Sequence, residues 1–124
     1  MSHAQSRGTR HAESDLELIR GTFDLLILKT LAWGPMHGLG VLRWIETVTE
    51  QRLLIEEGAL YPALHRLEQR GWVNAEWGYS ESNRRAKYYR LTPRGRRQLA
   101  TELSRWARYT EAVGMVITAD GGAR

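Results

Sequence analysis

The residues with the clearest chemical potential are polar and aromatic side chains that recur on one side of a helix. Tyr61, His65, Arg66 and Gln69 follow one another at helical spacing, opposite an apolar stripe. His, Arg and Gln side chains can bond base edges in the major groove of DNA, whereas a Tyr hydroxyl or a helix N-terminus can bond a phosphate. The pattern indicates a helix that contacts DNA, unless these side chains are only solvated.

A second cluster of polar residues lies in and beside the loop of a hairpin further along the chain, at residues 83–88. Arg side chains at a hairpin tip can enter the minor groove or hold phosphate oxygens; the alternative is a loop that only aids solubility. The residues that we predict to contact DNA are His37, Gly58, Ala59, Tyr61, Pro62, His65, Arg66, Gln69, Asn83, Arg84, Arg85, Lys87 and Tyr88.

The charge distribution favours contact with a polyanion. The net charge is +4, but residues 1–83 carry 8 basic and 11 acidic side chains, whereas residues 84–124 carry 10 basic and 3 acidic ones. A one-signed block beside a mildly acidic remainder is typical of a surface that meets nucleic acid, with a solvated helix face as the alternative. All basic residues except Lys29 and Lys87 are Arg, which suits phosphate and guanine contacts, although genomic base composition would have the same effect.

Three short helices must position the first cluster. A short helix at about 14–20 is expected to end at Gly21, so that Thr22 becomes the N-cap of the first main helix. A second helix is expected at about 37–51 and a third at about 58–70, which buries Leu60, Ala63, Leu64 and Leu67. Three helices with compact connections are typical of a helix-turn-helix unit.

The hydrophobic period then changes from helical to alternating. Residues 73–77 and 86–91 are predicted strands, and the polar, glycine-led segment 78–85 between them is the loop of a hairpin, or wing. Tyr88 and Tyr89 point to opposite faces of their strand, so one belongs to the core and the other is available to the DNA backbone. The predicted fold is mainly α with a small β-hairpin (α+β), a winged helix-turn-helix with a C-terminal dimerisation helix.

The last helix is expected at residues 93–118, with Thr92 as its N-cap and Pro93 at its first position. Apolar positions spaced alternately by four and three residues form a heptad seam, which predicts a homodimer through this helix. Thr110 and Gly114 weaken the seam, so we expect a mixed interface that also uses the N-terminal helix. The predicted interface residues are Leu16, Leu99, Leu103, Trp106, Thr110 and Val113.

The five tryptophans have several interpretations. Trp33 and Trp72 are expected to be structural, while Trp44 and Trp77 are ambiguous. Trp106 lies on the seam, where two copies facing each other across a gap would stack on a flat aromatic ligand. The simpler alternative is that Trp106 only packs in the interface.

Other classes of protein find little support in the composition. There is no Cys, and the four His have no metal-ligand spacing, so we expect no metal and no cofactor. Catalytic and nucleotide-binding motifs are absent, which argues against an enzyme. The longest apolar stretch, 23–33, is too short to span a membrane, and we expect a soluble cytoplasmic protein.

The domains are expected at 1–12 (a disordered tail), 13–92 (winged helix-turn-helix) and 93–118 (dimerisation helix).

Three motifs make the chain resemble the PadR family of bacterial transcriptional regulators over about residues 16–113. They are Gly34-Pro35-Met36-His37-Gly38, the run GALYPALHRLE at 58–68, and the run RAKYYRLTPRG at 85–95. The single C-terminal helix is similar to that of the compact subfamily. Leu39 departs from the family's common aromatic residue, and Ala59 departs from the usual Thr or Ser, which removes a hydroxyl that could meet phosphate.

The resemblance implies a two-fold dimer that binds a palindromic operator in double-stranded DNA, usually as a repressor released by a small molecule. The predicted partners are therefore duplex DNA and a second copy of the chain, with a small aromatic effector as an open hypothesis. The competing function is a winged-helix protein–protein interaction module that does not bind DNA.

Overall fold

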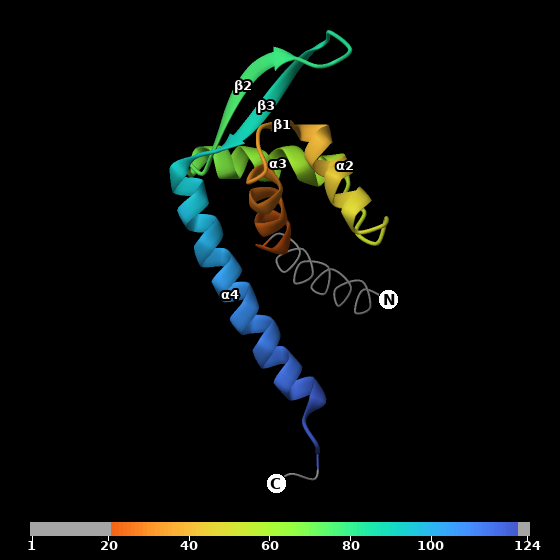
Figure 1. Cartoon of the computed structure of the whole chain (residues 1–124), viewed down its shortest axis with the longest axis vertical. Helices are drawn as coiled ribbons and strands as arrows, with labels where there is room; N and C mark the ends of the chain where they lie inside the picture. Colours follow the sequence, from red (N-terminus) through yellow and green to blue (C-terminus); the bar gives the residue numbers. More distant parts are fainter. Residues whose placement is uncertain (1–20, 122–124) are drawn as a thin grey trace, which may run out of the picture.

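Residues 21–121 are described by a computed structural model (Figure 1). A first helix includes residues 21–31, and the elements that follow are β1 (Met36–His37), α2 (Gly38–Val48), α3 (Glu57–Gln69), β2 (Val73–Tyr79), β3 (Arg85–Leu91) and α4 (Pro93–Thr118). The expected class, mainly α with a small β-sheet, is confirmed. The predicted tail at 1–12, the short helix at 14–20 and Leu16 lie outside the described residues.

The first helix, α2 and α3 meet in one hydrophobic core. Ile27, Leu28 and Leu31 of the first helix are 0–1% exposed, and the stripe predicted for α3, Leu60, Ala63, Leu64 and Leu67, is fully buried. The prediction that Thr22 caps the first helix is wrong, because Gly21 and Thr22 already lie within the helix. A glycine inside a helix costs only about 1 kcal/mol, which the burial of one neighbouring large apolar side chain is enough to offset.

The second helix is shorter at both ends than the sequence indicated. His37 is its N-cap rather than its first residue, and its Nδ1 accepts the Gly40 N–H at 3.1 Å. The helix ends at Val48, before Gln51, because Glu50 and Gln51 have φ angles of 53° and 66°. Such left-handed backbone ends a right-handed helix.

The sheet has three strands in the order β1-β3-β2, although the sequence indicated only a hairpin. β1 pairs with β3 through Met36↔Tyr89 and His37↔Tyr88. The hairpin loop is shorter than predicted, since Tyr79 still pairs with Arg85 and Asn83 supplies a left-handed turn residue at φ 60°. The extra strand ties the start of α2 to the wing, which we define as β2, β3 and the loop 80–84 between them.

The long helix α4 begins as predicted. The Thr92 hydroxyl accepts the Gly95 N–H at 2.9 Å and donates to the Gly71 carbonyl at 2.7 Å. Gly95 lies against the Trp72 carbonyl, where a Cβ would collide with backbone. α4 then leaves the body of the molecule (Figure 1). Its 26 residues extend about 39 Å.

One of the predicted interface residues belongs to the subunit core. Leu99 is 7% exposed and is part of the same hydrophobic cluster as the three helices. Its prediction as a dimer contact is wrong, because the first two turns of α4 still lie on the body of the molecule. Leu103 and Trp106, further along the helix, are 39% and 42% exposed.

Candidate nucleic-acid interface

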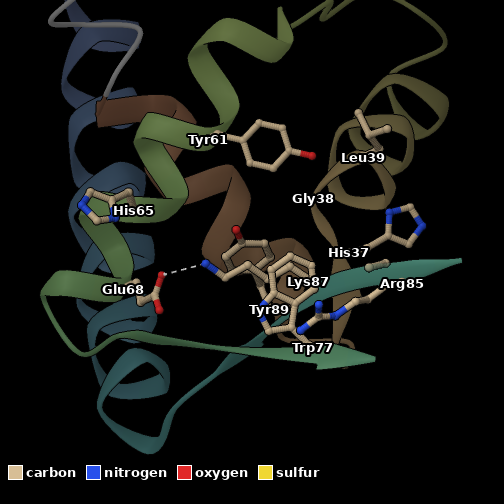
Figure 2. A pocket seen from close by; sticks show the side chains of 11 residues that line it. His37, Gly38, Leu39, Tyr61, His65, Glu68, Trp77, Arg85, Lys87 and Tyr89 are labelled. Atoms are coloured by element: carbon tan, nitrogen blue, oxygen red, sulfur yellow. Dashed lines mark ion pairs between the residues drawn. The ribbon is translucent and has the colours of Figure 1, made fainter. Parts of the chain in front are cut away.

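An open hollow of about 540 Å³ separates α3 from the wing (Figure 2). Tyr61, His65 and Glu68 line its α3 side, at positions i, i+4 and i+7 that share one helix face. Tyr61 is 44% exposed, and its ring comes so close to Gly38 that a Cβ there would approach the Tyr61 Cε1 to 2.9 Å. The contact between Tyr61 and Gly38 sets the spacing of α2 and α3 at this face.

The wing supplies the opposite wall. In its register Trp77 pairs with Lys87 and Tyr79 pairs with Arg85, and period-two alternation puts these four side chains on the face that carries Tyr89. Cations lie over aromatic rings there: the Arg85 Cζ is 4.5 Å from the Trp77 ring centroid, and the Lys87 Nζ is 5.7 Å from that of Tyr89. The wall is thus a ladder of alternating cations and aromatic rings.

Lys87 is held across the hollow by an acidic partner. Its Nζ is 4.0 Å from Glu68 Oε1, and both side chains are more than one third exposed (Figure 2). Beneath this pair Tyr89 is 4% exposed. Burial raises the pKa of the Tyr89 phenol above its ordinary value, and the negative charge of Glu68 and the neighbouring Tyr61 raise it further. The phenol is therefore neutral at physiological pH.

Most residues that we predicted to contact DNA are exposed on this side of the molecule or at the tip of the wing. The exposed ones are Gly58, Ala59, Tyr61, Pro62, His65, Gln69, Asn83, Arg84 and Arg85, and the half-buried ones are His37, Arg66, Lys87 and Tyr88. They come from the N-cap of α2, from α3, and from the loop and β3 of the wing.

Arg66, which we predicted to contact DNA, forms an ion pair within the subunit. Its Nη2 lies 2.8 Å from Oδ1 of Asp24 in the first helix, with the two side chains 30% and 23% exposed. The ion pair joins α3 to the first helix, so Arg66 has a role in the stability of the fold. The predicted DNA contact of Arg66 stays untested, and we leave it out of the proposed interface.

The two tyrosines of β3 point to opposite faces, as predicted, and Tyr89 is the core residue. Tyr88 lies on the other side of the sheet, where its ring meets that of His37 edge to face at 5.9 Å. Its hydroxyl donates to the Tyr79 carbonyl at 3.1 Å. These contacts brace the wing against the start of α2.

Sequence reasoning missed Glu68, Trp77 and Tyr79 as members of this face. Trp77 and Tyr79 are 59% and 71% exposed. The available signal was the alternation of the two strands, which places Trp77 beside Lys87 once the hairpin register is known. No sequence pattern indicated that Glu68 contacts Lys87, because the contact joins a helix to a strand and depends on how the two elements pack.

A second hollow, of about 370 Å³, lies between the first helix and α4. Leu25, Arg105, Trp106 and Tyr109 are among its lining residues, and the Trp106 and Tyr109 rings are 6.2 Å apart. Further exposed apolar side chains follow along α4, namely Met115, Val116 and Ile117.

The tryptophans outside the second hollow differ in burial. Trp44 and Trp72 are partly buried against the core, but Trp33 is 69% exposed, so its assignment as a packed structural residue is wrong. Trp33 lies in the turn after the first helix, at the surface, where the Lys29 Nζ is 5.6 Å from its ring centroid.

Comparison with known proteins decides the family. Residues 27–101 match the transcriptional regulator PadR-like family. The chain belongs to this family. It is therefore a transcription regulator and not an enzyme, and the predicted resemblance is confirmed.

Solved structures of PadR regulators share this architecture. A transcriptional regulator from Clostridium thermocellum is 31% identical, with 79% of this chain and 95% of that chain covered at a TM-score of 0.72. A PadR family transcriptional regulator from Eggerthella lenta is 29% identical, with 94% and 99% covered at 0.70. An uncharacterized protein from Lysinibacillus sphaericus is 28% identical over 99 residues, 80% of this chain and 91% of its own length. DNA binding and dimer formation are typical of the family.

Between residues 21 and 121, no three His, Cys, Asp or Glu side chains are grouped so that they could hold a metal ion. No helix in the same range is long and apolar enough to cross a membrane.

Proposed function

We propose that the protein is a repressor that binds a palindromic operator in double-stranded DNA as a homodimer, with α3 in the major groove and the wing on the adjacent backbone. The observation that carries this proposal is the convergence of the exposed α3 face and the arginine-tipped wing on one hollow. Tyr61 and His65 stand on one side of the hollow, and Arg85 and Lys87 on the other. The α3 wall has hydrogen-bonding groups for bases and phosphates, while the wing wall is cationic.

Dimer formation is supported by the outer part of α4. From Leu103 onward this helix diverges from the first helix, with a hollow between the two. The exposed apolar side chains of this part are Leu103, Trp106, Tyr109, Val116 and Ile117. A row of large apolar side chains on a projecting helix is unfavourable in water and is typical of a self-association surface. A two-fold axis through α4 would present two α3 helices to successive major grooves, about 34 Å apart.

The proposal is tested by selecting bound duplexes from a random pool and measuring the affinity of the selected sequence against salt. We expect a palindrome and an affinity that falls steeply with salt. Arg85→Ala should lower the salt slope by about 0.9 per wing, and Tyr61→Ala should weaken binding. Arg52→Ala is a matched control. The 11-residue helix α2 starts beside the sheet and ends away from it (Figure 1), and the exposed Arg52 follows that far end.

The competing interaction module without DNA binding makes the opposite prediction. It would show no preference among duplexes at any ionic strength, and Arg85→Ala would behave like Arg52→Ala. That result would refute DNA recognition by this face. Sedimentation at micromolar concentration tests the dimer separately, and a monomer at that concentration would contradict a palindromic operator.

We also propose that the hollow beside Trp106 takes a flat aromatic effector that releases the protein from DNA. Trp106 and Tyr109 provide two aromatic walls, and Arg105 provides a cation. Planar aromatic compounds should quench Trp fluorescence and weaken operator binding, and Trp106→Ala should remove both effects. Trp33→Ala, which removes another exposed indole, should retain them; equal quenching in Trp106→Ala would refute the site.

A further inference from the structure

We propose that Trp77 is a positioning residue that holds the Arg85 guanidinium towards a phosphate of the DNA strand entering the hollow between α3 and the wing. This inference rests on the proposed function, because it requires that the wing contacts DNA. Its new content is the role of the indole, which no sequence motif of the chain indicates.

The first observation is the stacking of the two side chains. The Arg85 Cζ lies 4.5 Å from the centroid of the Trp77 ring, although the two residues are not partners in the strand register. A guanidinium at this distance over an indole is attracted by the negative face of the ring. Arg has many rotamers of similar energy, so a contact that selects one lowers the entropy lost when the group binds a phosphate.

The second observation is the contrast between the two cations of the wall. Lys87 already faces a carboxylate, Glu68, at 4.0 Å, so a phosphate must compete with that carboxylate for the ammonium group. Within residues 21–121, Arg85 makes no ion pair with an Asp or Glu, and its side chain is exposed. Arg85 is therefore the cation of the hollow that is free to meet an anion, and the Trp77 indole is the group that orients it (Figure 2).

The third observation is that Trp77 itself is a poor structural residue. Its side chain is 59% exposed and it is absent from the hydrophobic core. An indole left in water within a paired strand is not explained by packing of the subunit. It is explained if it supports a cation on the face that binds DNA.

The test is a set of operator affinities for the full-length dimer, measured against salt for Trp77→Ala, Trp77→Phe, Arg85→Ala and the double variant. A cation–π contact at an exposed site corresponds to about two- to fivefold in affinity for each wing, hence about 4- to 25-fold for two wings. We expect Trp77→Ala to weaken binding by this factor, to lower the salt slope without removing a charge, and to lower the melting temperature by no more than about 5 °C, since the cation–π contact is also lost from the free subunit. Trp77→Phe should restore most of the affinity, and Trp77→Ala should add almost nothing when Arg85 is already Ala.

The outcomes separate this inference from the proposed function. If Arg85→Ala weakens binding but the two substitutions add independently, or Trp77→Ala leaves the salt slope intact, the indole does not act through Arg85 and the inference is wrong. If Arg85→Ala has no effect at all, the proposed wing contact fails first. Trp33→Ala is the matched control, because this exposed indole also lies beneath a cation, Lys29 at 5.6 Å, but does not line the hollow; an equal loss there would also overturn a role specific to Trp77.

Discussion

Replacing Arg66 by Ala separates a structural cation from a DNA-binding one. The Arg66–Asp24 pair is 2.8 Å long, joins α3 to the first helix, and is only about one quarter exposed. Exposed ion pairs are worth about 0.2–1 kcal/mol, and hydrogen bonds to charged groups in less exposed sites about 1.5–3 kcal/mol. We therefore expect Arg66→Ala to lower the free energy of unfolding by about 1–2 kcal/mol, or the melting temperature by roughly 5 °C.

The assay combines urea unfolding with operator binding. A double-mutant cycle with Asp24→Asn should give a coupling free energy of about 1 kcal/mol, because each single substitution breaks the same contact. Arg43→Ala, at an exposed position of α2, should change stability by less than about 0.5 kcal/mol. The salt slope of DNA binding should be the same for Arg66→Ala as for the unaltered protein. The reasoning is refuted if Arg66→Ala unfolds at the original urea concentration but loses salt slope, since Arg66 would then be a phosphate contact after all.

Three further predictions concern stability and assembly. Gly95→Ala should destabilise the subunit by about 2 kcal/mol or more in urea unfolding, because its Cβ would collide with the Trp72 carbonyl; unchanged stability would mean that α4 can shift freely. Leu99→Ala should cost about 2–5 kcal/mol of unfolding free energy, whereas Leu103→Ala should mainly weaken self-association in sedimentation; the reverse pattern would restore Leu99 to the interface. Burial raises the pKa of Tyr89, so the neutral phenol contributes to the free energy of unfolding. This contribution is complete below the ordinary pKa of 10.0 and is lost as the pH rises through the folded pKa. Unfolding between pH 8 and 11 should show this loss, and Tyr89→Phe should remove it; an identical profile in the variant would exclude Tyr89 as the group.

Elements with strong local signals could be predicted from the sequence. The apolar stripe of α3 and the Thr92–Pro93 start of α4 are encoded by residues close together in the chain, so spacing alone identified them. β1 could not be found in this way. It has only two residues, and its hydrogen-bonding partner is β3, about fifty residues later. A strand of two residues has no period to detect.

The candidate site shows the same division between local and distant contacts. Helical spacing placed Tyr61 and His65 on one face, because the α-helix has a fixed geometry. It could not tell that Arg66 is occupied by Asp24, since the two residues are 42 positions apart and an isolated helix exposes both. The interface prediction for Leu99 failed for a related reason. Its heptad position indicates a buried apolar side chain, but does not tell whether that side chain is buried in its own subunit or against a second copy.

These intramolecular pairs decide where the electrostatic part of DNA affinity must come from. On α3 the cation Arg66 is neutralised by Asp24, and Glu68 draws Lys87 towards the helix, so α3 offers the DNA little free positive charge. Between residues 84 and 97, the exposed cations that form no ion pair with the described residues are Arg84 and Arg85 of the wing and the arginines of the first turns of α4. Phosphate contacts fix affinity and register, whereas base contacts fix sequence choice. Substitutions in the wing, and at Tyr61, whose hydroxyl suits a phosphate, should therefore weaken binding to all duplexes alike, while substitutions at His65 should change which duplexes are preferred.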